Sequence, residues 1–160
     1  MIHLILETFI AAPVDHCFDL SRSIDLHMAS TDWTGERAIA GVASGLIGFG
    51  QQVTWEERHF GFKLHHTSRI TEYDRPHHFQ DCMVQGRFKS FCHDHYFESH
   101  NDGTVMRDEM EFTAPYGIIG NLFENALLKS HMKDLLLRRN KAIKQAAEGE
   151  NWRALVESKS

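Results

Sequence analysis

The sequence has few cysteines, no excess of positive charge and no long uncharged apolar run. Only three of its 160 residues are cysteine, too few and too scattered for the disulfide framework of a small secreted protein. We therefore expect Cys17, Cys82 and Cys92 to be reduced thiols in a reducing compartment. The formal net charge of −5 argues against a nucleic-acid partner, because such proteins carry a basic surface.

The sequence pattern also lacks export and membrane signals. No stretch approaches the roughly 18 uncharged apolar residues that a membrane-spanning helix needs. Segment 1–13 is apolar, but it has no basic region and Glu7 interrupts it, which differs from a signal peptide. We expect a cytoplasmic protein with no integral membrane segment.

Apolar residues in the middle of the chain recur with period two, the spacing of β-strands. Gly and Asp-Gly turns separate these runs, most clearly at 101–103, where Asn-Asp-Gly is a hairpin signal. Short connections between successive strands indicate an antiparallel sheet. The expected strands are 2–11, 36–42, 51–58, 62–73, 77–85, 88–99 and 104–113.

Helical patterns flank this sheet. Two short helices are expected between Pro13 and Ser30, and a long helix over 118–147 has one mainly apolar stripe. The sheet has an apolar face that only the long helix is able to cover. The predicted fold class is α+β, in the order β-α-α-β6-α: a curved antiparallel sheet around a C-terminal helix, with an internal cavity. Residues 1–149 form a single domain in this interpretation, and 150–160 form a C-terminal tail.

Four segments carry a resemblance to a known family. Segment 9–20 reads FIAAPVDHCFDL; segment 86–97 contains Gly-Arg-Phe and then Phe91, His93, His95 and Phe97; segment 103–108 reads GTVMRD; segment 115–117 reads PYG. In these motifs the chain resembles the SRPBCC superfamily, which includes START lipid-transfer domains. Within it, the chain is similar to uncharacterised bacterial polyketide cyclase/dehydrase-like proteins. The resemblance implies the helix-grip fold.

The resemblance does not carry a ligand over to this chain. Phe91 stands where the family tends to have Trp, and His66 where another large aromatic residue is usual, so the shape of the cavity differs. The family holds carriers, cyclases, hydrolases and receptors, and membership therefore says more about fold than about function.

Alternation along the strands predicts which side chains face the interior. Five apolar residues are expected to form cavity walls, and five polar ones to lie among them. Ligand cavities commonly combine apolar walls with a few polar groups that orient the ligand. The predicted ligand-binding residues are His66, Asp81, Phe91, His93, His95, Phe97, Met106, Asp108, Met110 and Phe112.

His93, His95 and Asp108 are open to several interpretations. They are either a self-satisfied structural network, groups that orient a ligand, or candidate catalytic residues for general acid–base chemistry. The two histidines also share a strand face, and Asp108 or His66 could add a third zinc ligand. Without a Cys or carboxylate motif this signal is weak, so no metal and no cofactor is predicted.

The function expected from the sequence is binding of a hydrophobic or aromatic small molecule, such as a lipid or polyketide-like compound. The alternative is a cyclase- or dehydratase-type enzyme in which the histidine–aspartate group transfers protons. A second alternative is a non-catalytic scaffold or regulatory domain. The sequence leaves open whether the chain forms a homodimer.

Overall fold

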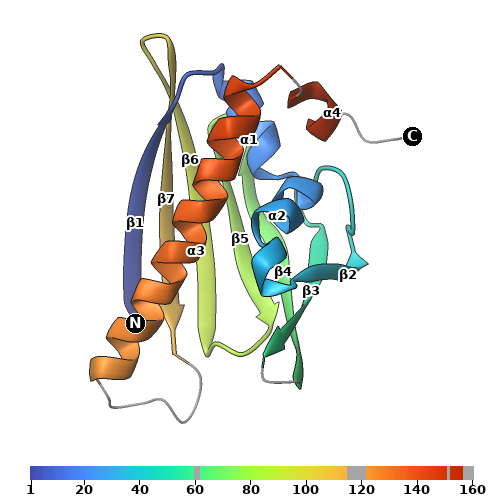
Figure 1. Cartoon of the computed structure of the whole chain (residues 1–160), viewed down its shortest axis with the longest axis vertical. Coiled ribbons are helices and arrows are strands. Elements are labelled where there is room, and N and C mark those ends of the chain that lie inside the picture. Colours follow the sequence, from blue (N-terminus) through green and yellow to red (C-terminus); the bar gives the residue numbers. More distant parts are fainter. Residues whose placement is uncertain (60–61, 115–121, 151, 157–160) are drawn as a thin grey trace.

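A single sheet of seven antiparallel strands organises the computed structural model, which describes residues 1–59, 62–114, 122–150 and 152–156 (Figure 1). The strand order is β1-β7-β6-β5-β4-β3-β2. Each strand predicted from the sequence is present, and its ends differ by at most two residues from those expected. The strands are β1 (Ile2–Ile10), β2 (Arg37–Gly41), β3 (Gln52–His59), β4 (Phe62–Asp74), β5 (His78–Gln85), β6 (Ser90–His100) and β7 (Gly103–Thr113).

Four α-helices and a short 3₁₀ helix complete the described chain. They are α1 (Val14–Ser21), α2 (Ile24–Ser30), η1 (Asp32–Thr34), α3 (Leu122–Glu148) and α4 (Trp152–Val156). Ser23 caps α2, because its side-chain oxygen accepts a hydrogen bond from the Leu26 N–H at 3.2 Å. The predicted start of the long helix and the motif at 115–117 lie outside the described residues.

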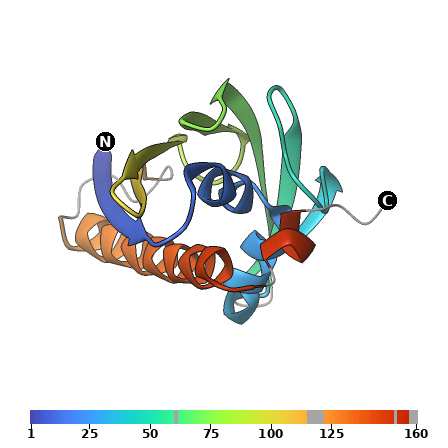
Figure 2. The same cartoon turned by 90° about the horizontal axis from the view of Figure 1, so that it is seen from above.

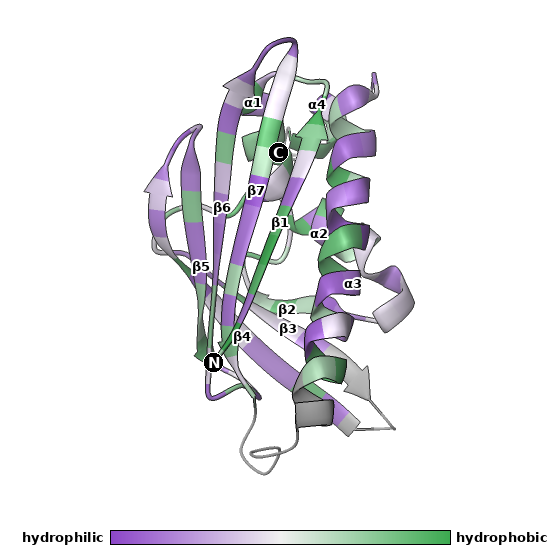
Figure 3. Cartoon of the chain, turned by 90° about the vertical axis from the view of Figure 1, so that its left-hand side faces the viewer, coloured by the Kyte–Doolittle hydropathy of each residue, from purple (hydrophilic) through white to green (hydrophobic). Residues whose placement is uncertain are grey.

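The sheet is curved, and the helices occupy its concave side. Seen from above, the sheet curls around α1, and α3 runs along the open side from the β1 edge towards α2 (Figure 2). Buried residues alternate with more exposed ones along β7, and bands of hydrophobic colour mark this strand in Figure 3. The predicted α+β helix-grip architecture is confirmed.

Aromatic side chains fill the core under α1. Phe18 packs edge-on against Tyr73, Phe79 and Phe97, with ring centroids 5.4 Å apart in each pair. A second apolar cluster joins the other end of the sheet to α3. Its buried members are Leu4, Met110, Phe112 and Leu136.

The C-terminal segment packs on the domain. Trp152 of α4 stacks on His16 of α1, with ring centroids 3.6 Å apart. The hydroxyl of Ser23 also donates a hydrogen bond to the Leu155 carbonyl at 3.2 Å. The predicted tail therefore contains a helix that covers the N-terminal end of α1.

The cysteines differ from the sequence expectation. Cys82 and Cys92 lie opposite each other on β5 and β6 and form a disulfide, whereas Cys17 is a free, buried thiol. The expectation of three reduced thiols is wrong, because the pairing depends on the register of two strands and not on sequence spacing. Since disulfides are rare in the cytosol, cysteine content no longer supports the predicted cytoplasmic location. No helix in the described part of the chain is long and apolar enough to cross a membrane.

Candidate functional site

A cavity of about 880 Å³ lies inside the fold. It is lined by residues of β3 to β7, of α2 and of α3, among others. Apolar side chains supply most of its wall. They include Val53, Trp55, Ile70, Phe79, Phe91, Met110, Leu135 and Leu136.

A buried carboxylate, Asp108 of β7, is the centre of a polar network beside this cavity. Its side chain is fully buried. One of its oxygens, Oδ1, accepts hydrogen bonds from His93 Nε2 at 2.9 Å and from His95 Nδ1 at 3.0 Å. The other oxygen, Oδ2, accepts from the amide of Asn140 on α3 at 2.7 Å. Three side chains from two elements therefore converge on one carboxylate.

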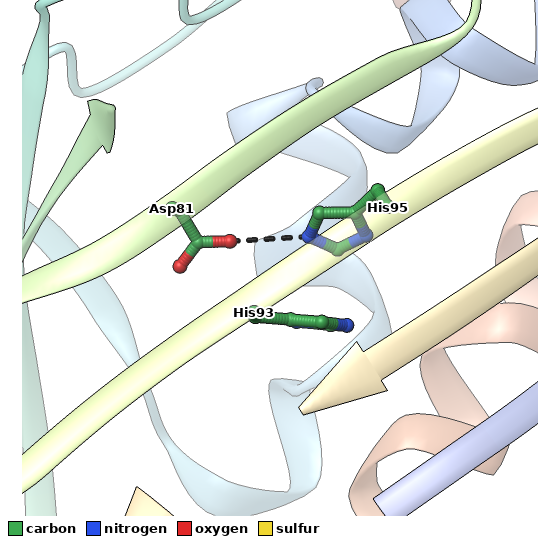
Figure 4. A group of neighbouring side chains, drawn as sticks. All are labelled: Asp81, His93 and His95. Carbon is green, nitrogen blue, oxygen red and sulfur yellow. Dashed lines mark hydrogen bonds and ion pairs between the residues drawn. The ribbon is translucent and has the colours of Figure 1, made fainter. Parts of the chain in front are cut away.

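A second carboxylate, Asp81 of β5, holds the other side of His95. Its Oδ2 lies 3.1 Å from His95 Nε2 (Figure 4). His95 therefore lies between two carboxylates, with Nδ1 facing Asp108 and Nε2 facing Asp81.

The surroundings keep both carboxylates ionised. Burial alone would raise the pKa of Asp81, but the hydrogen bond from His95 and the charges of His93, His95 and Arg139 outweigh it and lower the pKa to about 2. Burial likewise opposes ionisation of Asp108, yet the hydrogen bonds from the two histidines hold its pKa well below the ordinary value. Both groups are therefore anionic at neutral pH.

His93 is neutral at the same pH. Burial and the neighbouring charge of His95 lower its pKa to about 4, although Asp108 and Asp81 act in the opposite direction. Because Nε2 of His93 faces Asp108, this nitrogen carries the ring proton and Nδ1 is left with a free lone pair.

Arg139 of α3 brings a positive charge to the cavity wall. Its Nη2 donates a hydrogen bond to the Ser21 carbonyl at 2.7 Å, and its Nη1 lies 3.6 Å from Asp108 Oδ1. Nη1 is buried and has no hydrogen-bond partner among the residues that the structure describes. The charged group near this atom is the carboxylate of Asp108.

Six of the ten residues predicted to bind a ligand line the cavity: His66, Asp81, Phe91, His93, His95 and Met110. Asp108 lies behind the two histidines. The remaining three belong to the core and are not in the cavity wall.

The strand pattern predicted three cavity-wall residues that do not line the cavity, namely Phe97, Met106 and Phe112. All three are on the buried face, as alternation required. However, α1 packs over the end of β6 and β7 that carries Phe97 and Met106. Phe112 is covered by Phe88 and Phe91, with ring centroids 5.5 Å and 6.3 Å away.

Sequence reasoning missed two features of the site. The first is Asn140, which is buried. Its helical spacing from Leu136 and Ile143 was the signal that could have placed it on the buried face of α3. His27 and Glu36 form a further pair at the cavity, with His27 Nε2 3.0 Å from Glu36 Oε2. Burial would raise the pKa of Glu36, but the hydrogen bond and charge of His27 lower it. No sequence signal marked this pair, because it forms only when α2 packs beside β2.

Neither a family model nor a curated protein sequence matches the chain, but solved structures share its fold. One is the protein TTHA0849 from Thermus thermophilus, with a TM-score of 0.69, 14% identity, and coverage of 91% of this chain and 99% of that one. Another is StfQ, a di-domain ARO/CYC from the steffimycin biosynthetic pathway, with a TM-score of 0.68, 13% identity, and coverage of 92% of this chain and 50% of that one.

A third similar structure is a START superfamily protein from Mycobacterium smegmatis. It has a TM-score of 0.63 and 12% identity, and the alignment covers 91% of this chain and 97% of that one. At these identities the likeness concerns the arrangement of elements and not the side chains of the cavity. The chain therefore has the helix-grip fold of the START-like proteins.

Proposed function

We propose that this protein binds an apolar, aromatic small molecule that carries an acidic oxygen group. The observation that carries the proposal is the cavity of about 880 Å³. Its volume is within the range of about 300–1,000 Å³ that is typical of small-molecule sites. Its wall is mainly apolar, with a few polar groups, which is also the usual composition of such sites.

The polar groups support an oxygen-bearing ligand. A buried polar hydrogen without an acceptor costs about 1–3 kcal/mol, and more for a charged group. Arg139 lines the cavity, and its Nη1 lacks a hydrogen bond among the described residues, so a rotation of the guanidinium would let it donate to a carboxylate, phenolate or enolate oxygen of the ligand. In this proposal His66, Phe91 and Met110 contact the apolar body of the ligand, while Asp81, His93 and His95 flank its polar end.

A protein with the same fold supports an aromatic ligand class. StfQ is an ARO/CYC from a biosynthetic pathway, and an aromatic polyketide-like molecule with acidic oxygens would match both the apolar wall and Arg139. A lipid is the other class that the START-like fold suggests. The two differ in rigidity and oxygen content, which mass determination of a bound molecule distinguishes.

Binding is tested with 1-anilinonaphthalene-8-sulfonate, an aromatic anion that fluoresces in apolar surroundings. The variant Leu135→Trp places a large ring in the cavity wall and should lower probe affinity at least tenfold. The control Leu137→Trp, at a position 43% exposed on the same helix, should leave affinity unchanged. Arg139→Met should weaken binding of the sulfonate while keeping the apolar wall. Equal affinity in wild type and Leu135→Trp would contradict the proposal. Native mass spectrometry of the purified protein would identify a molecule that co-purifies.

An enzyme of cyclase or dehydratase type is the second candidate, favoured by the histidine–aspartate network at the cavity wall. A general base works best when its pKa is close to the working pH. The pKa of His93 is lowered to about 4, which makes this ring a weak base at neutral pH, so binding ranks first. The variant His93→Gln separates the two: an enzyme would lose turnover of a candidate polyketide and keep affinity, whereas a binding protein shows no turnover in either form.

A further inference from the structure

Three side chains in the cavity wall have the composition and spacing of a metal site. Asp81 of β5 and His93 and His95 of β6 each offer one ligand atom, and these atoms all lie within 4.8 Å of one another. Asp81 is directly opposite His93 in the strand register, and His95 follows two residues later on the same face (Figure 4). We propose that Asp81, His93 and His95 bind a divalent first-row transition-metal ion such as Zn²⁺.

Asp108 already orients both imidazoles as a metal site requires. A histidine that binds a metal through one nitrogen usually donates its other ring N–H to a carboxylate or carbonyl. Asp108 accepts from Nε2 of His93 and from Nδ1 of His95. The nitrogens left for the metal are therefore Nδ1 of His93 and Nε2 of His95. One buried carboxylate serves both rings.

The distances suit a metal. Zinc–nitrogen and zinc–oxygen bonds of about 2.0–2.2 Å at right or tetrahedral angles place two ligand atoms about 3.0–3.4 Å apart. His95 Nε2 and Asp81 Oδ2 are already 3.1 Å apart. One ligand atom from each of the three side chains lies within 4.8 Å of the other two, so metal binding would require side-chain rotations that shorten the widest separation by roughly 1.5 Å.

The charges also balance. A divalent ion would take the place of the direct contact between His95 Nε2 and Asp81 Oδ2. The charge of the ion is then matched by Asp81 and Asp108, both anionic. The positive charge of Arg139 opposes the ion, but the Asp108 carboxylate 3.6 Å away offsets part of that charge, and Nη2 of Arg139 is held by the Ser21 carbonyl.

The proposed ion would face the cavity. Asp81, His93 and His95 all line it, and three protein ligands leave one or more coordination positions open. Two histidines and one carboxylate are a ligand set that suits zinc and ferrous iron. The open positions would admit water or an oxygen of a molecule in the cavity. The site itself does not depend on the ligand proposed above.

Titration of the protein with the metal ion alone tests this proposal. Protein stripped with a chelator is titrated with Zn²⁺ by calorimetry and with Co²⁺ by visible absorption. We expect one equivalent to bind with micromolar or tighter affinity. In the Co²⁺ form, proton NMR should show two strongly shifted exchangeable signals, from the two ring N–H groups that donate to Asp108. Absence of a one-equivalent site, or of the two shifted signals, would overturn the proposal and leave the network as a purely hydrogen-bonded one.

Two variants locate the site. Asp81→Asn keeps the shape of the side chain, removes its charge and should lower Zn²⁺ affinity at least tenfold. Asp94→Asn is the matched control: Asp94 is on β6 facing the other way, where it accepts from His78 Nε2 at 2.8 Å. The Zn²⁺ affinity of the Asp94→Asn variant should equal that of the wild-type protein. Asp108→Asn should lower affinity by about 10–100-fold, the usual effect of a group that orients a metal ligand. Unchanged affinity in Asp81→Asn, or an equal loss in Asp94→Asn, would place the metal elsewhere and refute the assignment.

Failure of the metal site is distinguishable from failure of the proposed function. Binding of 1-anilinonaphthalene-8-sulfonate is measured with and without Zn²⁺. Probe binding that persists in Asp81→Asn without Zn²⁺ binding separates the cavity from the ion. Should Asp81→Asn unfold, as circular dichroism would show, the Co²⁺ spectra and the shifted N–H signals of the wild-type protein decide the question alone.

Discussion

Replacing Asp108 by alanine removes the acceptor on which His93, His95 and Asn140 converge. The substitution leaves Asp81 as the one carboxylate that holds His95, and it leaves the ring N–H of His93 and the amide of Asn140 buried without this partner. It also removes the negative charge nearest to Arg139, 3.6 Å away. We expect a large loss of stability.

The magnitude follows from these contacts. Hydrogen bonds to a charged group each contribute about 1.5–3 kcal/mol, so three of them set an upper bound of roughly 9 kcal/mol. The cost of burying the Asp108 charge offsets part of this sum. Removing one partner of a buried ion pair typically destabilises by about 3–5 kcal/mol, and we expect a loss in that range. Such a loss is a large fraction of the roughly 5–15 kcal/mol that stabilises an ordinary domain.

The assay is urea unfolding at neutral pH, followed by circular dichroism and extrapolated to water. The control is Asp94→Ala, which removes a carboxylate from the outer face of β6, where its side chain is 21% exposed. Asp94 accepts hydrogen bonds from His78 and Gln80, but water screens this partly exposed group, so the control should lose no more than about 2 kcal/mol. A loss for Asp108→Ala below about 1 kcal/mol, or equal to that of the control, would refute the role assigned to the network.

Three further predictions concern other parts of the chain. Burial would raise the pKa of Asp19, but Arg75 and Arg22 hold this pKa below 3.8. The ionised carboxylate of Asp19 therefore stabilises the fold above pH 3.8, and this stabilisation is lost as the pH falls through the lower pKa of the folded state. Asp19→Asn should therefore cost stability at neutral pH and much less at strongly acidic pH, and an equal cost at both would contradict this. Trp152→Ala removes the stack on His16 and should cost about 1–2 kcal/mol, seen as a lower melting temperature; an unchanged one would show that α4 contributes nothing. Unfolded protein should react with a thiol reagent at one cysteine before reduction and at all three afterwards. Three reactive thiols without reductant would contradict the disulfide. Joint replacement of Cys82 and Cys92 by Ser should lower the free energy of unfolding by roughly 2–3 kcal/mol for a closed loop of this length.

The sheet could be predicted because its signals are local. Period-two alternation and Gly or Asp-Gly turns mark each strand within a few neighbouring residues. The register between strands is not local, and the disulfide between Cys82 and Cys92 depends on it. The helix α4 is only five residues long, too short to show a helical period.

The site was predictable only as far as strand faces determine it. Alternation placed His93, His95 and Asp108 on one side of β6 and β7, and the structure joins them by hydrogen bonds. The contributions of Arg139 and Asn140 required the position of α3 over the sheet. Strand patterns do not contain that position, and for the same reason they did not show how α1 covers part of the predicted cavity wall.

The polar network has a consequence for how β6 is aligned during folding. His93 and His95 alternate with Asp94 and Tyr96 along this strand, and a slip by one residue would exchange the two faces. Asp94 would then enter the apolar interior away from His78, its donor on the outer face, while Asp108 would lose both imidazoles. Each error costs several kcal/mol, so the register of β6 is set by its polar contacts as well as by its hydrophobic pattern. A chain with a misaligned β6 would therefore be less stable than the native register by that amount.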